Sequence, residues 1–375
     1  MLRISMLLTT ALIASACSPT SVSADTASGG KPFQTTEIAT FNEPWAITFL
    51  PEFNQALITE KSGKLMLWEA EGPVVEVGGV PQVAYGGQGG LGDVILHPDF
   101  ANNRTIYLSY AEAGDGGFGA AVATAKLDTS ADKPQLTDLK VIWRQYPKVS
   151  GRGHYGHRMA FSPDGKYLFI ASGERQKFDP AQDMNSNMGK VLRLFPDGSV
   201  PTDNPFYDAA KPVTSQIWSL GHRNPLGIAF DSKGQLWNQE MGPAHGDELN
   251  LVKRGANYGY PKVSNGDHYD GRDIPDHKPG DGFEAPKVFW NPAISPGGLA
   301  YYNGDLFPKW KNSMFLGGLG SEALIRVTLN GEQAAKADQW DMGARIREVE
   351  TAADGSLWIL EDGPKGRLLK LTPKG

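Results

Sequence analysis

The chain has very little cysteine and no excess of basic residues. Cys17 is the only cysteine among 375 residues, so an intramolecular disulfide framework is excluded. With 36 Lys and Arg against 42 Asp and Glu, the net charge of −6 argues against a nucleic-acid surface, which normally carries a basic excess. No stretch beyond the N-terminal region reaches the roughly 18 consecutive apolar residues of a membrane helix. Stability must therefore come from a packed core, or from a bound metal or cofactor.

The N-terminal residues have the pattern of an export signal. Arg3 precedes a short apolar run, and Ala14-Ser15-Ala16 is similar to a signal-peptidase cleavage site. Because Cys17 follows at once, residues 1–16 resemble a bacterial lipoprotein signal peptide, with Cys17 as the lipidated first residue. Cleavage after Ala24 is the alternative and would release a free soluble protein. We expect export in either case, with the lipidated form anchored to the outer membrane on its periplasmic side.

Composition divides the rest of the chain into a tether and a folded domain. Residues 17–34 are rich in Ser, Thr, Ala and Gly and predict a flexible tether, which leaves residues 35–375 for the folded domain. The whole chain contains 45 Gly and 26 Pro, mixed with nine Trp, 12 Tyr and 16 Phe. Such a mixture is typical of many turns between short strands rather than of disorder.

A unit of two strands joined by a turn of Pro, Asp or Gly type recurs along the domain. No long apolar period of 3.6 residues occurs, whereas residues 168–170 and 357–359 alternate with period 2. Aligned on the turn, the copies are spaced by 47, 65, 69, 71 and 50 residues, enough for four short strands each. The six copies lie at residues 45–60, 92–112, 157–174, 226–240, 298–318 and 347–362. The sequence therefore predicts an all-β protein folded as a six-bladed β-propeller.

Polar and Gly-rich residues precede five of these six units. In a propeller such positions lie at one face around the central axis, where we expect them to converge into a site. The segments are residues 87–90, 153–157, 221–224, 295–298 and 345–347. A purely structural scaffold has no need of them.

One of these segments contains two histidines, His154 and His157. Imidazole titrates near neutral pH, so one of them is a candidate general base. Glu174, at the far end of the same hairpin, is a candidate to orient that base. Alternatively, the histidines are hydrogen-bonded structural residues or metal ligands, although no cysteine or third histidine lies near them in the sequence.

Arg345 and Arg347 are two residues apart and would point to the same side of a strand. Two adjacent guanidiniums repel each other unless an anion lies between them. Together with Arg223 they predict a pocket for a ligand with several carboxylates or phosphates. Separate ion pairs with Glu348 or Asp341 are the alternative.

Gly242-Pro243 precedes a pair of carboxylates, Asp247 and Glu248. Backbone carbonyls and carboxylates are ligands that Ca²⁺ prefers, so a calcium site is one interpretation and a plain turn is the other. The spacing is not that of an EF-hand.

The chain resembles the soluble aldose sugar dehydrogenases that depend on pyrroloquinoline quinone (PQQ), also called the glucose/sorbosone dehydrogenase family. The most specific match is GHRNP at residues 221–225, followed by GPxxxDExNL at residues 242–251. Further matching segments are residues 86–100, 154–165, 188–206, 217–230, 240–261 and 343–349. The family fold is a six-bladed propeller, in agreement with the repeat count.

The resemblance implies the following catalytic roles. His154 would be the base that takes the proton of the anomeric hydroxyl, and Glu174 would stand for the carboxylate, usually Asp, that orients it. Arg223 would stabilise the negative charge that develops on the quinone oxygen. His157 and Asp247 would lie near the substrate.

The resemblance also implies two cofactors, PQQ and Ca²⁺. Gln88, Arg223 and Asn224 match residues that contact PQQ, and the pair Arg345 and Arg347 matches the residues that hold its carboxylates. The backbone carbonyls of Gly242 and Pro243 match ligands of a Ca²⁺ ion that polarises the quinone.

The chain departs from well-studied glucose-oxidising relatives at four places. Gly153 stands where they have Asp, and residues 317–323 are Gly-rich where they have a Lys that reaches PQQ. His157 replaces a small residue, and Glu174 is one methylene longer than Asp. These departures concern PQQ affinity and glucose preference more than the reaction class.

The leading hypothesis is an exported dehydrogenase that oxidises aldose sugars to lactones and passes electrons to a separate acceptor, with no nucleic-acid partner and no membrane contact beyond the lipid anchor. One alternative is a Ca²⁺-dependent six-bladed lactonase or related hydrolase, which does not need three convergent arginines. The other is a non-catalytic, ligand-binding propeller that has lost the cofactor.

Overall fold

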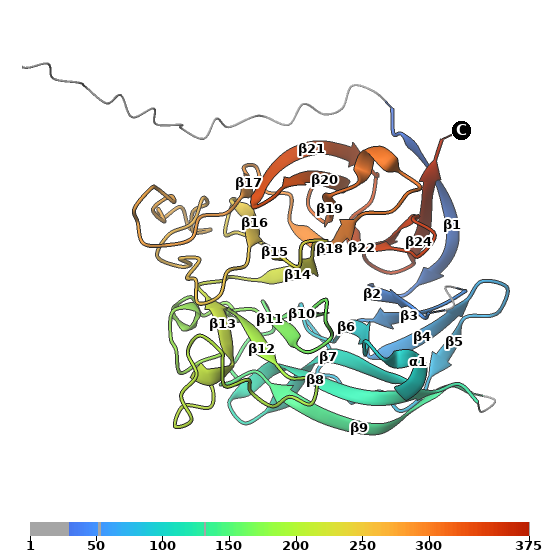
Figure 1. The fold of residues 1–375 in the computed structure, drawn as a ribbon, viewed down its shortest axis with the longest axis horizontal. Helices are drawn as coiled ribbons and strands as arrows, with labels where there is room; N and C mark the ends of the chain where they lie inside the picture. The colour runs from blue at the N-terminus through green and yellow to red at the C-terminus, as the bar shows by residue number, and fades with distance from the viewer. Residues whose placement is uncertain (1–29, 52–53, 131–132, 375) are drawn as a thin grey trace, which may run out of the picture.

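The computed structural model describes residues 30–51, 54–130 and 133–374. The predicted signal peptide (residues 1–16) and Cys17 lie outside these ranges. Six four-stranded antiparallel sheets surround a common axis, as Figure 1 shows. The prediction of an all-β, six-bladed propeller is therefore confirmed. No helix among the described residues is long and apolar enough to cross a membrane.

Each blade is built from strands that follow one another in the chain, except the last. Blade 1 contains β2 (Pro44–Phe49), β3 (Gln55–Glu60), β4 (Lys64–Glu69) and β5 (Val75–Val77), and blade 2 contains β6 (Leu91–Leu96), β7 (Thr105–Gly114), β8 (Gly117–Asp128) and β9 (Gln135–Arg144). Blade 3 contains β10 (Gly156–Phe161), β11 (Leu168–Ser172), β12 (Lys190–Leu194) and β13 (Ile217–Leu220), and blade 4 contains β14 (Pro225–Phe230), β15 (Leu236–Glu240), β16 (Asp247–Leu251) and β17 (Val288–Trp290). Blade 5 contains β18 (Pro296–Tyr302), β19 (Ser313–Gly318), β20 (Ala323–Asn330) and β21 (Gln333–Asp341), and blade 6 contains β22 (Ile346–Thr351), β23 (Leu357–Glu361), β24 (Gly366–Pro373) and β1 (Phe33–Phe41).

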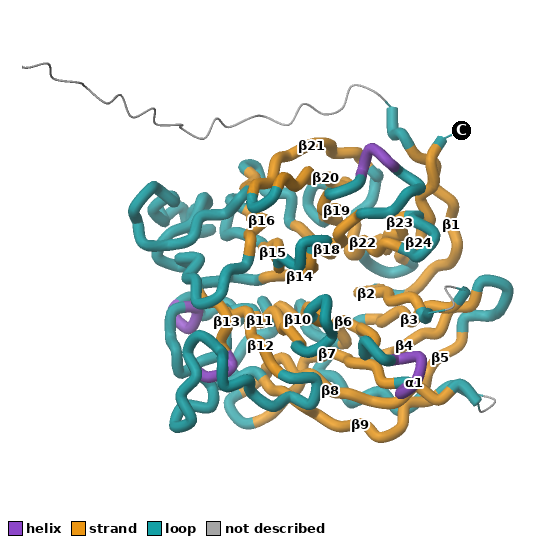
Figure 2. Tube along the Cα trace, viewed as in Figure 1, coloured by secondary structure: helices purple, strands orange, loops and turns teal. Residues whose placement is uncertain are grey.

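Helical structure in the described residues is confined to short turns between strands. They are α1 (Phe100–Asn103) and the 3₁₀ turns η1 (Asp179–Ala181), η2 (Thr214–Gln216) and η3 (Pro308–Trp310). Figure 2 shows that loops make up most of the remainder.

The six predicted two-strand units are the two inner strands of the six blades. The second strands, such as β11, β15 and β23, are buried along their whole length because each blade packs between two neighbours. Among the described residues, six hydrophobic clusters join adjacent blades, and a seventh, small one contains Ala181, Tyr260 and Ile274. Burial on both faces explains why the residues between the alternating ones, Phe169 in β11 and Trp358 in β23, are apolar as well.

The strand β1 closes the propeller by pairing with β24, so that the N-terminal segment completes the C-terminal blade. Phe33 is only 1% exposed and packs edge-on against Trp310 and Trp340, with ring centroids 5.9 and 5.4 Å away. Phe33 and Gln34, which were assigned to the predicted tether (residues 17–34), therefore belong to β1, whereas residues 17–29 of that prediction lie outside the described residues. Composition alone does not show that the Phe33 side chain is buried by the aromatic residues of blade 5.

The longest connection in the described chain, residues 252–287, joins β16 to β17 without regular secondary structure (Figure 2). The Tyr260 N–H donates to the Gly221 carbonyl (3.0 Å), and the Ala244 N–H donates to the Asp267 carbonyl (2.8 Å). These bonds attach the segment to the loops that enter and leave the inner strands of blade 4.

Candidate active site

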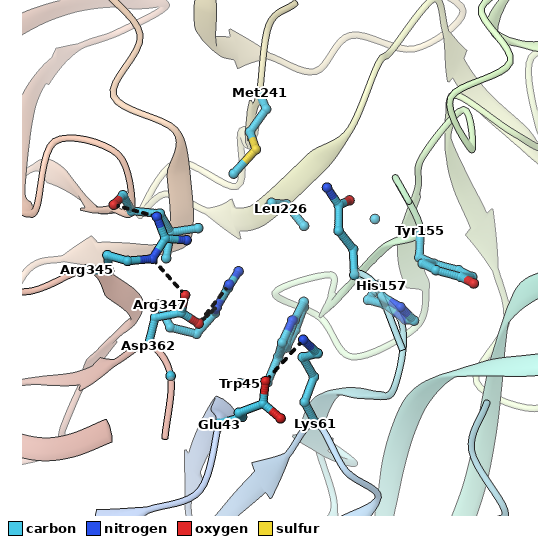
Figure 3. Close-up of a pocket in the computed structure, with 15 residues that line it drawn as sticks. Glu43, Trp45, Lys61, Tyr155, His157, Leu226, Met241, Arg345, Arg347 and Asp362 are labelled. Atoms are coloured by element: carbon cyan, nitrogen blue, oxygen red, sulfur yellow. Dashed lines mark hydrogen bonds and ion pairs between the residues drawn. The ribbon is translucent and has the colours of Figure 1, made fainter. Parts of the chain in front are cut away.

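A cavity of ≈ 270 Å³ opens on the propeller axis, at the face where the innermost strand of each blade begins (Figure 3). Its walls come from all six blades and the loops that enter them, and include aromatic, aliphatic and charged side chains. The lining residues are Glu43, Trp45, Lys61, Gly87, Gln88, Tyr155, Gly156, His157, Leu226, Met241, Leu319, Arg345, Arg347, Asp362 and Gly363. Three of the five predicted segments, residues 87–90, 153–157 and 345–347, thus contribute to one cavity. Gly221 and Arg223 of a fourth line a separate hollow, and residues 295–298 line neither.

His154 lies beside this cavity, next to the lining residues Tyr155 and Gly156, and is 5% exposed. Its Nδ1 is 2.5 Å from Oε1 of Glu174, and its backbone N–H donates to Oε1 of Gln88 at 2.7 Å. The structure therefore brings together the base, its carboxylate and a predicted PQQ contact. Their catalytic roles stay predictions.

The electrostatic environment keeps this imidazole neutral. Burial lowers the pKa of His154 below its usual value, and nearby Arg223 lowers it further, although the hydrogen bond with Glu174 acts in the opposite direction. Burial acts to raise the pKa of Glu174, but hydrogen bonds from His154 and from the Phe178 N–H outweigh it and lower that pKa. With an ionised Glu174 accepting from Nδ1, the lone pair for taking a proton is on Nε2 of His154.

Arg175, which sequence reasoning missed, holds the loop of His154. Its guanidinium donates to the carbonyls of Gly153 (2.8 Å), Phe118 (2.6 Å) and Gly151 (2.7 Å) and lies 3.8 Å from the ring centroid of Tyr155. The side chain is 1% exposed, and no carboxylate in the described part of the chain forms an ion pair with it. Only its position after Glu174 could have drawn attention to it.

Arg223 and Asn224 present buried donors that lack partners. Arg223 donates to the Met241 carbonyl (3.1 Å) and to the Tyr269 hydroxyl (3.4 Å), but its Nε has no partner within the described residues. Asn224 accepts from the Gly156 N–H at 3.2 Å, while its Nδ2 is also unpartnered in that part of the chain. Leaving such groups unpaired costs about 1–3 kcal/mol each, which indicates that a ligand completes the site.

Arg345 and Arg347 share a carboxylate, Asp362 (Figure 3). The Arg345 Nε donates to Oδ2 at 3.0 Å, and Nε and Nη2 of Arg347 donate to Oδ1 at 3.0 and 2.9 Å. The alternative of separate ion pairs with Glu348 or Asp341 is therefore wrong. Glu348 pairs with Arg158 deeper in the molecule, and Asp341 accepts from the Gly343 N–H (2.8 Å).

A second, smaller hollow lies next to Arg223 and includes Gly242 and Pro243 in its wall. Neither carbonyl oxygen of this pair accepts a hydrogen bond from any described residue. Asp247 fixes the turn, because its carboxylate accepts from the backbone N–H groups of Gly242 (2.8 Å), Ile294 (2.7 Å) and Ser295 (2.6 Å). Asp247 thus lies behind the candidate ligands, with its oxygens occupied by the protein.

His157 lines the axial cavity and is 3% exposed. It lies between Trp45 (5.7 Å between ring centroids) and Tyr155 (5.2 Å), and neither ring nitrogen finds a partner in the described residues. Burial lowers its pKa to about 3, so the ring is neutral. The alternative of a histidine metal centre gains no support, since the described residues contain no group of three or more His, Cys, Asp or Glu that could hold a metal.

Lys61 and Glu43 are two further lining residues that the sequence did not single out. Glu43 precedes β2 and Lys61 follows β3, and Nζ of Lys61 lies 3.4 Å from Oε1 of Glu43 (Figure 3). The cavity therefore contains a lysine, although the segment 317–323 supplies none.

Taken together, fold and site define a class: a six-bladed propeller with arginines and a carboxylate-bound histidine around an axial cavity. The chain matches the glucose/sorbosone dehydrogenase family over residues 41–370 and belongs to it. It is 42% identical over 342 residues to the aldose sugar dehydrogenase YliI of Escherichia coli (strain K12), which covers 89% of this chain and 91% of the relative. The family prediction is confirmed.

Solved structures show the same architecture. The soluble aldose sugar dehydrogenase of Escherichia coli in its apo-form superposes with a TM-score of 0.86 at 40% identity, covering 91% of this chain and all of the other (100%). The PQQ-bound aldose sugar dehydrogenase of Streptomyces coelicolor gives a TM-score of 0.75 at 29% identity, covering 92% and 100%.

Proposed function

We propose that this protein is a PQQ- and Ca²⁺-dependent dehydrogenase that oxidises aldoses at C1 to lactones and passes the electrons to a separate acceptor. The observation that carries the proposal is the buried His154–Glu174 pair, 2.5 Å apart, beside a cavity whose charged wall contains Arg345 and Arg347. The names of the relatives, aldose sugar dehydrogenase among them, and the PQQ-bound structure of one of them support it.

The residues present fit PQQ, a flat quinone with three carboxylates. Arg345 and Arg347 keep N–H groups beyond those bonded to Asp362, and each can take a ligand carboxylate. The unpartnered buried donors of Arg223 and Asn224 suit the quinone oxygens. Gln88, also at the cavity wall, would contribute from the side of His154.

The residues also fit Ca²⁺. The free carbonyl oxygens of Gly242 and Pro243 are hard donors next to Arg223 and to the candidate quinone site. A Ca²⁺-dependent lactonase would instead need several metal-binding carboxylates at the axis, and the described residues contain no such group.

Each side chain then has a defined task. Nε2 of His154 takes the proton of the C1 hydroxyl, and Glu174 stabilises the imidazolium that results. Arg223, which is 5% exposed, places positive charge where negative charge develops. When bound, PQQ supplies the quinone that accepts the hydride from C1, and Ca²⁺ polarises it. Loss of one proton and one hydride converts the sugar to its lactone.

Reconstitution tests the proposal. Protein purified without cofactor is mixed with PQQ and Ca²⁺, and dye reduction is followed with a panel of aldoses. We expect PQQ-dependent turnover, which His154→Ala lowers by at least about 10²-fold with PQQ binding intact, because a general base contributes about 10²–10⁴. Arg345→Ala should instead weaken PQQ binding, with the exposed Arg272→Ala as control. Absence of any PQQ-dependent rate or change in quinone absorbance would refute the proposal.

A further inference from the structure

Lys61 is a cation in the wall of the axial cavity that has no task in the proposed reaction. Its backbone is fixed on both sides, because the Lys61 N–H donates to the Glu43 carbonyl (3.0 Å) and the Lys61 carbonyl accepts from the Leu91 N–H (3.1 Å). Gly90 packs so closely that an added Cβ would lie 2.0 Å from the Lys61 carbonyl oxygen. The side chain therefore enters the cavity from a rigid base (Figure 3).

The strands of blade 1 place Lys61 beside the two arginines of the cavity. The Glu43 N–H donates to the Gly363 carbonyl at 3.0 Å, and Gly363 directly follows the carboxylate that the arginines share. On the other side, the bond between Lys61 and Leu91 attaches the loop that contains Gln88. The Lys61 ammonium thus belongs to the same group of polar side chains as the arginine pair and Gln88.

The bond that holds the Lys61 ammonium is weak. Within the described residues its carboxylate partner is Glu43, and the distance from Nζ to Oε1 is 3.4 Å. Charge-assisted bonds of this kind are normally about 2.7–2.9 Å long. Glu43 has a closer partner in the Tyr85 hydroxyl, which donates to Oε2 at 2.5 Å. Because an ammonium has three N–H donors, Lys61 keeps donors for a ligand.

The cations of the cavity match the charge of the candidate cofactor. Among the described residues that line the axial cavity, the cations are Lys61, Arg345 and Arg347. PQQ has three carboxylates, and the two arginines can take two of them. A carboxylate that leaves water needs a cationic partner. Lys61 is the lining cation that remains for the third.

We propose that Lys61 binds a carboxylate of PQQ as the third cation of the cavity, an inference that rests on the proposed function. Glu43 holds the ammonium at the cavity wall and competes with the ligand for it. Loss of the positive charge at Lys61 therefore weakens PQQ binding, whereas loss of the negative charge at Glu43 strengthens it. The second effect depends on Lys61 being present.

The test measures PQQ binding directly, without sugar. PQQ is titrated into Ca²⁺-loaded protein, and binding is followed by tryptophan fluorescence, to which Trp45 in the cavity wall contributes. We expect Lys61→Met to raise the Kd about tenfold, equal to ~1.4 kcal/mol. Lys61→Arg, which keeps the charge, should stay within about threefold of wild type.

Lys287→Met is the matched control. Nζ of Lys287 lies 3.3 Å from Oε1 of Glu284, and these side chains are 16% and 24% exposed, against 20% and 24% for Lys61 and Glu43. Lys287 is not among the residues that line the axial cavity. Its replacement should leave the Kd for PQQ unchanged.

Salt dependence separates an ion pair from a packing effect. Because salt screens charge pairs, the Kd of Lys61→Met should rise less steeply with salt concentration than that of wild type. Glu43→Gln should lower the Kd, and should do so less in the Lys61→Met background.

Equal Kd values for wild type and Lys61→Met overturn the inference, as does a raised Kd with an unchanged salt dependence. Weaker PQQ binding by Glu43→Gln overturns the competition between Glu43 and the ligand. Wild-type protein that does not bind PQQ would instead refute the proposed function.

Discussion

The backbone of His154 has φ +48°, a left-handed conformation that costs a residue with a side chain roughly 1 kcal/mol or more. Surrounding hydrogen bonds maintain it: the His154 N–H donates to Gln88, and the His154 carbonyl accepts from the Arg175 N–H at 3.1 Å. Gly173 packs so closely that an added Cβ would lie 2.2 Å from that carbonyl oxygen. Neighbouring residues therefore decide where the candidate base lies, and Arg175 contributes most of the bonds.

At this scale we predict that Arg175 positions His154 and, after burial and Arg223, helps to lower its pKa. Because burial and the cations Arg223 and Arg175 lower the pKa of His154, the active neutral form should persist below pH 6.5, and kcat/KM should fall only as the imidazole becomes protonated. Arg175→Met removes one cation, so this pKa rises and the acidic limb moves to higher pH. We expect kcat to fall at least about tenfold as well, because the loop loses three bonds.

Profiles of kcat/KM from about pH 5 to 8 provide the measurement, and Arg175→Lys is the control. Lysine keeps the charge but cannot reach three carbonyls at once, so kcat should fall while the acidic limb stays in place. If the acidic limb does not move in Arg175→Met, Arg175 does not lower the pKa of His154. If kcat is unchanged in both variants, the hydrogen bonds of Arg175 do not position His154.

Among the elements, the turn between β15 and β16 carries Gly242 and Pro243, the candidate calcium ligands. Asp247 begins β16, and its carboxylate binds three backbone N–H groups from two segments. Burial raises its pKa, although those three bonds act to lower it. The resemblance placed Asp247 near the substrate, whereas its observed contacts are those of a brace for the Gly242-Pro243 turn.

We therefore predict that Asp247→Ala weakens the response to Ca²⁺. Loss of the carboxylate leaves three buried N–H groups unpaired, at about 1–3 kcal/mol each, and frees the carbonyls of Gly242 and Pro243 from their fixed positions. The Ca²⁺ concentration for half-maximal activity should rise at least about tenfold, and the Ca²⁺-dependent increase in Tm should shrink. Asp270→Ala, at an exposed ion pair with Arg272, should behave like wild type; equal Ca²⁺ curves for both variants would count against the brace.

Over the whole molecule, stability depends on closing the ring of blades. The strand β1 pairs with β24 from Phe33↔Pro373 to Phe41↔Gly366, and Phe33 fills an aromatic cluster with Trp310 and Trp340. Loss of the Phe33 contact should leave the six sheets in place but weaken the packing of blade 6 against blade 5.

We predict that Phe33→Ala lowers the free energy of unfolding by about 3–5 kcal/mol, as expected for removing a buried phenylalanine. Its neighbour Gln34 is exposed on the same strand, so Gln34→Ala should change stability by less than about 0.5 kcal/mol. Urea unfolding followed by circular dichroism measures both, and coincident midpoints for the two variants would show that β1 closure contributes little.

Much of this organisation could be read from the chain before folding is considered. Paired strands with their turns recur locally, so the inner two strands of all six blades were predictable. The strand β1 was not, because it lacks the repeated turn and its partner lies at the other end of the chain. In the site, His154, Arg345 and Arg347 stood out by residue type and spacing, whereas Arg175, Lys61 and Asp362 had no local signal.

The sequence by itself determined the all-β class, the number of blades and the face on which polar loops gather, because these follow from neighbouring residues and their periodicity. Only the tertiary structure decided the pairings: Asp362 rather than Glu348 for the two arginines, three backbone amides for Asp247, and Tyr269 beside Arg223. Such partners come from strand ends and loops whose separation in space depends on how whole blades pack. The physical reason is that a charged group or hydrogen-bond donor pairs with the acceptor nearest to it in the folded protein. Separation along the chain does not determine which acceptor that is.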